Sequence, residues 1–90
     1  MTHQALAKIV ARHGAATQTE NRLELPATAE LTLFVALADE ALLVERVRTM
    51  ELEDEYVVAH TSRGERFVVL YGDVRAVRFA SSQASAGYAA

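Results

Sequence analysis

The sequence predicts a mainly β, α+β fold: an N-terminal helix followed by a strongly bent five-stranded antiparallel sheet or small barrel. Short apolar runs separated by polar turns follow one another between Glu30 and Phe79. The helical period of apolar residues is confined to residues 3–13, and the apolar alternation changes phase within the second run. With 90 residues, the chain has room for one domain.

The predicted helix has one apolar stripe, because Leu6, Ile9 and Val10 recur at helical spacing. Thr2 is expected to cap its first turn, and Gly14 stands where a left-handed residue commonly ends a helix. About three turns are marginal in isolation, so the helix is expected to dock on the sheet.

A connector over Ala15–Ala29 follows the helix. Leu23 and Leu25 alternate with polar residues there, which allows a short strand, and Pro26 is expected to end that strand or to place it at an edge.

The sheet is predicted from five runs: Leu31–Ala38, Ala41–Met50, Tyr56–Thr61, Arg66–Tyr71 and Ala76–Phe79. The first run is apolar on both faces, so one face is expected in the core and the other under the helix. The phase change in the second run predicts a bulge or sharp bend near Val47–Thr49.

The turns of the sheet are marked by smaller signals. Gly64 suits a hairpin residue with positive φ, and the three-residue spacing of Val74 and Val77 predicts a tight helical turn before the last strand. The whole organisation is then a helix (1–14), a connector (15–29), a small β-barrel (30–79) and a flexible tail (80–90).

This order of elements resembles the Sm-like fold and the related SH3-like barrels. Tyr71, followed by a short step and then Ala76 and Val77, is similar to the second signature of bacterial Sm-like RNA chaperones. That signature carries a Lys-His pair after the aromatic residue, and Gly72 and Asp73 stand there instead. The resemblance therefore implies the fold and a tendency to form rings, and it transfers no RNA-binding residue.

Composition and charge limit the classes of function. The formal net charge of −3 argues against a generic nucleic-acid binder, which usually shows a basic excess. The chain has no cysteine, which rules out disulfides and thiolate metal sites and agrees with a cytoplasmic protein. No apolar stretch approaches the ~20 residues of a membrane span, and the N-terminus lacks the pattern of a signal peptide.

No catalytic, cofactor or metal motif is evident, so we expect a protein that is not an enzyme and needs no cofactor. The acidic residues between the second and third predicted strands match no metal-binding loop and are interpreted as solvated turn residues. The histidines do not stand at ligand spacing, and no Gly-x-Ser-x-Gly elbow is present. The residues considered for these sites are Glu51, Glu53, Asp54, Glu55, His3, His13 and His60.

Arginines on the second and last strands are candidates for a nucleic-acid contact, because guanidinium groups grip phosphates bidentately. The residues of this basic strip would be Arg46, Arg48, Tyr71, Arg75 and Arg78. Cross-strand ion pairs with neighbouring acids are the favoured interpretation, with Glu45, Glu65 and Asp73 as partners.

Self-association is the second expectation. Val68, Val69 and Leu70 stand in a row, which predicts a strand covered on both faces, and a small barrel with unpaired edges invites association. The leading hypothesis is a homo-oligomeric β-barrel module that binds another protein, and the alternative is an Sm-like RNA-binding protein that uses the basic strip.

Overall fold

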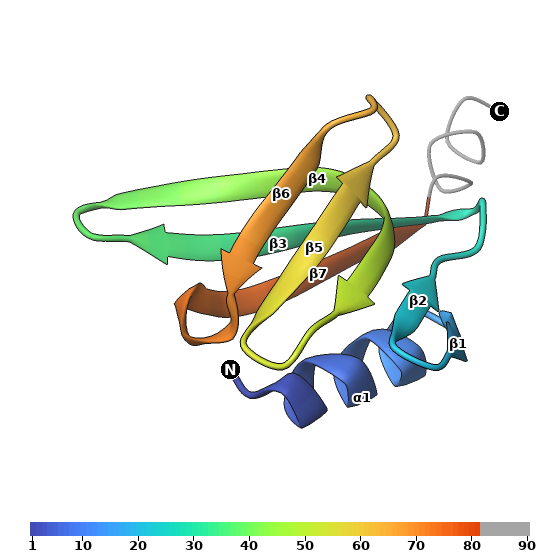
Figure 1. Ribbon diagram of the computed structural model, residues 1–90. Helices are drawn as coiled ribbons and strands as arrows, with labels where there is room; N and C mark the ends of the chain where they lie inside the picture. Colours follow the sequence, from blue (N-terminus) through green and yellow to red (C-terminus); the bar gives the residue numbers. More distant parts are fainter. Residues whose placement is uncertain (82–90) are drawn as a thin grey trace, which may run out of the picture.

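The chain folds as one helix and a seven-stranded antiparallel sheet, in a computed structural model that describes residues 1–81 (Figure 1). The elements in order are α1 (His3–His13), β1 (Thr17–Thr19), β2 (Arg22–Glu24), β3 (Ala29–Leu37), β4 (Glu40–Leu52), β5 (Tyr56–Thr61), β6 (Arg66–Leu70), the 3₁₀ turn η1 (Tyr71–Asp73) and β7 (Val74–Ser81). The predicted fold class is confirmed.

The sheet curls into a half-barrel because β4 is shared by two parts of it. The first half of β4 pairs with β3, which pairs with β7 on its other edge. The second half of β4 lies between β2 and β5, and β5 pairs with β6. In Figure 1, β5 and β6 therefore cross in front of β3 and β7, and the space between them is the core.

Two β-bulges make β4 bend. The register with β3 shifts so that Glu45 and Arg46 together oppose Thr32, and the register with β5 shifts at Arg48. Bulges increase the local twist and turn a strand, which lets a small sheet curl on itself. The bend predicted near Val47–Thr49 is thereby confirmed.

The core fills the concave side of the sheet. Its largest fully buried side chains come from almost every element: Leu6, Val10, Leu23, Leu31, Leu33, Val35, Val44, Val47, Met50, Val57 and Val74. Strands β2 to β7 contribute residues from their inward-facing side, as the period of two requires, whereas β1 is exposed throughout.

Helix α1 closes the lower end of the half-barrel (Figure 1). The Thr2 hydroxyl accepts a hydrogen bond from the Ala5 N–H at 3.1 Å, which confirms the predicted N-cap. The His3 ring meets the Tyr71 ring edge-on with centroids 5.4 Å apart, and the Met1 ammonium donates to the Tyr71 carbonyl at 3.0 Å.

The expectation that α1 covers the second face of β3 is wrong. Leu6 and Val10 enter the same core as the concave faces of the strands. On the outer face, Phe34 is paired with Leu43 and Ala76, which are both exposed, so no element within residues 1–81 covers this part of β3.

Gly14 ends α1 for a reason other than the predicted one. Its φ is −95°, and the left-handed residue is Ala15, with φ 54°. A β-carbon on Gly14 would lie 2.7 Å from Cε1 of Phe79 and 2.8 Å from the Val10 carbonyl oxygen. Glycine is needed here because β7 approaches the helix end closely.

The remaining boundaries differ by small amounts from the predicted ones. Strand β1 was not predicted, because Thr17–Thr19 is polar and fully exposed and so shows no alternation. A tight turn does precede the last strand, but it is η1 at Tyr71–Asp73, whereas Val74 and Val77, whose spacing predicted it, belong to β7. Strand β7 also extends past Phe79 to Ser81. Of the predicted tail, residues 82–90 lie outside the described part of the chain.

Candidate interaction surface

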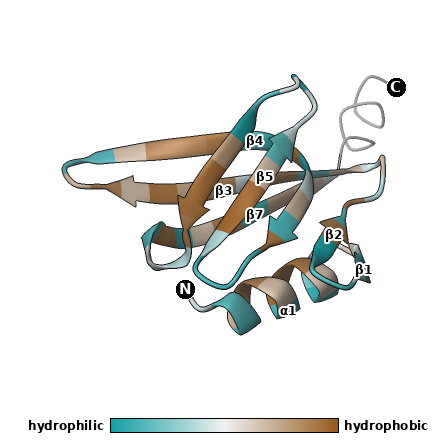
Figure 2. Ribbon diagram, viewed as in Figure 1, coloured by the Kyte–Doolittle hydropathy of each residue, from teal (hydrophilic) through white to brown (hydrophobic). Residues whose placement is uncertain are grey.

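The outer side of the β5–β6 hairpin presents an apolar surface to solvent. Tyr56 pairs with Leu70 and Val58 pairs with Val68, and antiparallel partners project to the same side of a sheet. Val68 is 65% exposed, Leu70 57% and Tyr56 38%. We call Tyr56, Val58, Val68 and Leu70 the β5–β6 outer patch; Figure 2 colours much of these two strands as hydrophobic.

The hairpin alternation explains why apolar residues face outward here. Val57 and Ala59 are fully buried and alternate with residues of the patch, so both faces of β5 are apolar. The turn that follows fixes this register: Gly64 has the predicted positive φ, 80°, and its N–H donates to the Thr61 carbonyl at 3.1 Å.

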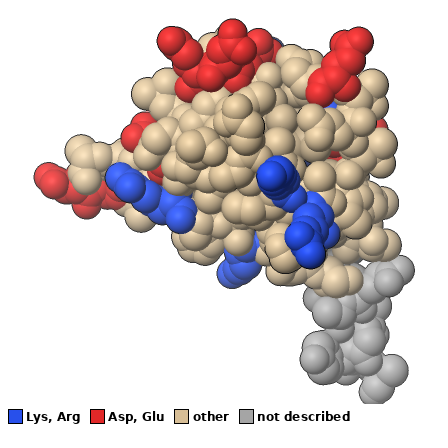
Figure 3. All heavy atoms as spheres, turned by 90° about the horizontal axis from the view of Figure 1, so that it is seen from below, with Lys and Arg blue, Asp and Glu red and all other residues tan. Residues whose placement is uncertain are grey.

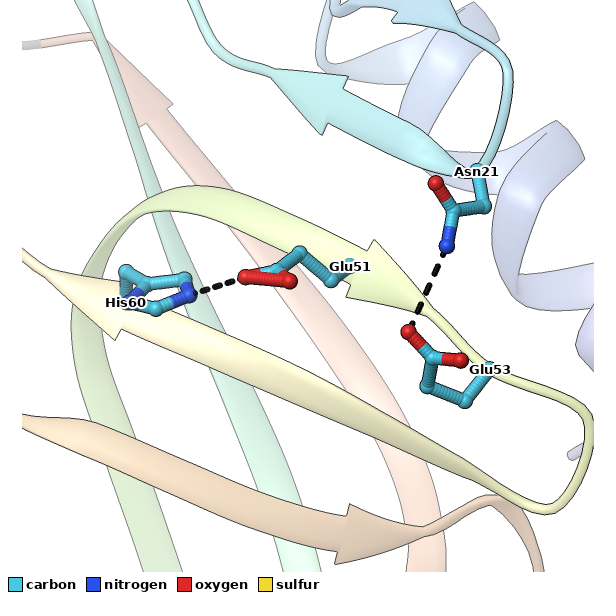
Figure 4. A network of polar contacts seen from close by, with 4 residues as sticks. All are labelled: Asn21, Glu51, Glu53 and His60. Carbon is cyan, nitrogen blue, oxygen red and sulfur yellow. Dashed lines mark hydrogen bonds and ion pairs between the residues drawn. The ribbon is translucent and has the colours of Figure 1, made fainter.

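A polar rim borders the patch on β4. His60 Nε2 and Glu51 Oε2 are 2.6 Å apart across β4 and β5, and Glu51 is the register partner of Val58 (Figure 4). Beyond them, the Asn21 side-chain amide donates to Glu53 at 3.3 Å. An apolar centre with a polar border is typical of protein–protein contact surfaces.

Strands β1, β6 and β7 each have one edge without a partner strand within residues 1–81. Strand β1 pairs only with β2, β6 only with β5, and β7 only with β3. Each free edge presents unpaired N–H and C=O groups, which favour pairing with a further strand. The outer patch is therefore adjacent to a backbone edge that can also make contacts.

The three residues proposed for self-association do not share one environment. Val68 and Leu70 lie in the outer patch, whereas Val69 is 5% exposed and belongs to the core. The expected cover on both faces of β6 is absent among residues 1–81, since only the inner face is packed. Tyr56 and Val58 were not predicted as part of this surface, because only the register between β5 and β6 places them beside Leu70 and Val68.

Tyr71, proposed for the basic strip, is a buried residue. Its hydroxyl donates to the Glu53 carbonyl at 2.6 Å, which ties η1 to the β4–β5 turn. Burial raises the pKa of Tyr71 from 10.0 to about 12, and the negative charges of Glu53 and Asp54 add to the rise. Its ring packs against His3 and is 6% exposed, so it offers no stacking platform.

The arginines of the proposed strip divide into two places. Arg46 and Arg48 line one pocket beside the bulges of β4. Arg75 and Arg78 are exposed on β7, where Arg75 stands at a register shift and Arg78 pairs with Thr32. On the face shown in Figure 3, basic side chains form separate groups and do not make a continuous strip.

The cross-strand ion pairs expected for these arginines are not formed. Within residues 1–81, the pair of His60 and Glu51 is the only one with nitrogen and oxygen within 4.0 Å. Arg48 has other partners, because its guanidinium donates to the carbonyls of Leu25, Pro26 and Ala29 at 2.9, 2.7 and 2.5 Å. Its role in the described chain is to fill the gap between β2 and β3.

Residues 1–81 contain neither a metal-binding cluster nor a membrane-spanning helix. No group of three or more His, Cys, Asp or Glu side chains in residues 1–81 could hold a metal ion. In the same part of the chain, no helix is long and apolar enough to cross a membrane.

Comparisons of this chain with protein-family models, with curated proteins and with solved structures each find no match.

Proposed function

We propose that this chain is a non-enzymatic small β-barrel module that associates with copies of itself and binds another protein. The observation that supports this function best is the β5–β6 outer patch beside the free edge of β6. Val68 and Leu70 each expose more than half of their surface there. Burial of adjacent exposed apolar residues drives association, and an unpaired strand directs it.

The strand order supports a relationship to the Sm-like and SH3-like barrels. Strands β6, β5, β4, β3 and β7 are hydrogen-bonded neighbours in that order, and β1 and β2 branch from β4. A 3₁₀ turn stands immediately before β7. The bend of the long β4 falls where such barrels turn a strand from one part of the sheet to the other.

The positions of the free edges suggest how copies would meet. Strand β6 of one copy would pair with β7 of the next, which is a head-to-tail contact between different surfaces. Contacts of this type generate a ring when the rotation between copies closes.

A protein partner is favoured over a nucleic acid. The chain carries a net charge of −3, Tyr71 is buried, and the basic side chains on the face shown in Figure 3 form separate groups. A nucleic-acid surface usually combines a basic track with exposed aromatic rings.

Sedimentation velocity at micromolar concentration tests the proposed assembly. We expect the wild-type chain to sediment as an oligomer and the double variant Val68→Glu, Leu70→Glu to sediment as a monomer. Leu37→Glu is the matched control, because Leu37 is 45% exposed and lies at the tip of the β3–β4 hairpin, away from the patch.

A wild-type chain that is monomeric at these concentrations would contradict the assembly. Binding of single-stranded RNA that weakens steeply with salt would instead support the nucleic-acid alternative.

A further inference from the structure

A second surface feature, separate from the outer patch, is the pocket beside the bulges of β4. It has a volume of about 320 Å³ and is lined by Ala27, Glu30, Arg46, Arg48 and Ser62. These residues come from the β2–β3 connection, the start of β3, both bulges of β4 and the β5–β6 turn. The pocket thus forms only where the curled sheet brings four segments together.

Arg46 holds an unfavourable backbone conformation at this pocket. Its φ is 58°, in the left-handed region that glycine adopts without strain and that residues with a β-carbon avoid. The Arg46 carbonyl accepts a hydrogen bond from the Ser62 N–H at 2.9 Å, which fixes the bulge to the β5–β6 turn. Backbone strain of this kind is concentrated at ligand-binding and other functional sites.

The Arg46 guanidinium has no partner among residues 1–81. No hydrogen bond or ion pair joins its side chain to the rest of that segment. The strained backbone therefore holds the Arg46 side chain at the pocket, although this side chain makes no polar contact that would stabilise residues 1–81.

Arg48 supplies a fixed second charge. Its guanidinium uses three of five N–H donors on the carbonyls of Leu25, Pro26 and Ala29 and keeps two. No carboxylate within residues 1–81 lies within 4.0 Å of it, so its positive charge is not neutralised by an ion pair. Its three bonds hold it in place before any ligand arrives, which lowers the entropy lost on binding.

The charges of the pocket select the ligand. Two arginines and Glu30 leave one net positive charge, which suits a singly charged group. A phosphate monoester carries nearly two negative charges at neutral pH and would be repelled by Glu30. A carboxylate has one charge, and its two oxygens match the fork of a guanidinium.

We propose that this pocket is a binding site for a carboxylate group, gripped by Arg46 with help from Arg48 and the Ser62 hydroxyl. The carboxylate would belong to a small organic acid or to an acidic side chain of a peptide. All five lining residues belong to one chain, so the proposal does not rest on the self-association proposed above.

The test uses the full chain, labelled with ¹⁵N, at constant low ionic strength. Sodium acetate and a blocked peptide with a single glutamate are the probes, each with one negative charge, and sodium chloride and the matching glutamine peptide are their controls. We expect millimolar acetate or the acidic peptide to shift the resonances of Arg46, Ser62 and Glu30. If the acidic peptide binds more tightly than the small acid, the natural ligand is an acidic side chain of a peptide. If the two probes bind with similar affinity, the natural ligand is a small organic acid.

Arg46→Gly separates binding from folding, because glycine tolerates the positive φ and should leave the chain folded. We expect this variant to bind the probe roughly tenfold more weakly, the usual scale for a lost charge-assisted hydrogen bond. Arg75→Ala is the matched control, since it removes the same charge from β7 outside the pocket and should bind like wild type.

Several results would overturn the assignment: no shift at the pocket with either acidic probe, equal shifts with sodium chloride, or full affinity in Arg46→Gly. Tighter binding of inorganic phosphate or of an RNA oligonucleotide at the same residues would also overturn it.

Discussion

Arg48 and Tyr71 show how far the role of a single side chain depends on partners distant in sequence. Both are polar residues on strand-like segments, a pattern that predicts surface positions. In the fold, Arg48 bonds to carbonyls 19 to 23 positions away, and Tyr71 bonds to the Glu53 carbonyl 18 positions away. Alternation of residue types could predict the strands, but it carries no information about which carbonyls would meet these side chains.

Replacing Tyr71 by phenylalanine should lower stability at neutral pH and change its dependence on alkaline pH. At neutral pH the loss is expected to be about 1 kcal/mol, because the Glu53 carbonyl loses its bond from the hydroxyl. The pKa of Tyr71 is about 12 in the folded chain against 10.0 in the unfolded one. Between these values the unfolded state binds fewer protons, so the wild-type free energy of unfolding falls as the pH rises from about 10 to about 12.

Urea unfolding at neutral pH and at several values from pH 9 to 12 measures both effects of Tyr71→Phe. The variant should lose less stability than the wild type across the alkaline window, because it has no hydroxyl to titrate. Equal slopes in the two proteins would contradict the raised pKa. Tyr56→Phe serves as the control, since Tyr56 is a partly exposed tyrosine of the outer patch.

The helix and strands could be predicted from the sequence wherever the spacing of apolar residues indicates the type of element. Strand β3 follows from a continuous apolar run, β4 to β6 follow from apolar alternation, and the phase change in β4 correctly located a bulge. The placement of α1 was not predictable in this way, because its apolar stripe fits the outer face of β3 as well as the open end of the half-barrel. The helix packs at the open end, because Leu6 and Val10 can be buried in the core there.

Gly14→Ala tests the close packing between α1 and β7. The new β-carbon would lie 2.7 Å from the Phe79 ring and 2.8 Å from the Val10 carbonyl, so the helix end must shift. Overpacking costs about 1–3 kcal/mol, and the better helix propensity of alanine offsets part of it. We expect a net loss of about 1 kcal/mol in the free energy of unfolding, measured by urea denaturation.

Gly72→Ala is the matched control for this substitution. A β-carbon on Gly72 would have no heavy atom within 4 Å. Its effect is therefore expected to stay within about 0.5 kcal/mol. Stability of Gly14→Ala equal to that of Gly72→Ala would show that Phe79 does not restrict the helix end.

The whole molecule leaves part of its apolar surface uncovered. A chain of 90 residues buries a smaller share of its surface than a larger domain, so its stability alone is modest. Leu70 and Val68 on β6 remain exposed beside a free strand edge, and Leu43 is exposed on the opposite outer face. The sequence could indicate this surplus of apolar residues, but only the register of β5 and β6 shows which of them gather in one patch.

If copies associate through the outer patch, the stability of the folded chain must depend on its concentration. Association stabilises the folded state by mass action, so each tenfold rise in protein concentration should raise the thermal midpoint by about 3–6 °C. Leu70→Glu should abolish this dependence while leaving the monomer folded, because Leu70 is 57% exposed and a surface change usually alters folding stability by about 0.5 kcal/mol or less. Leu37→Glu should keep the dependence, because Leu37 lies at the hairpin tip. A wild-type midpoint that stays constant across micromolar to millimolar concentrations would show that the outer patch is not buried between copies. The patch would then be free for the protein partner alone.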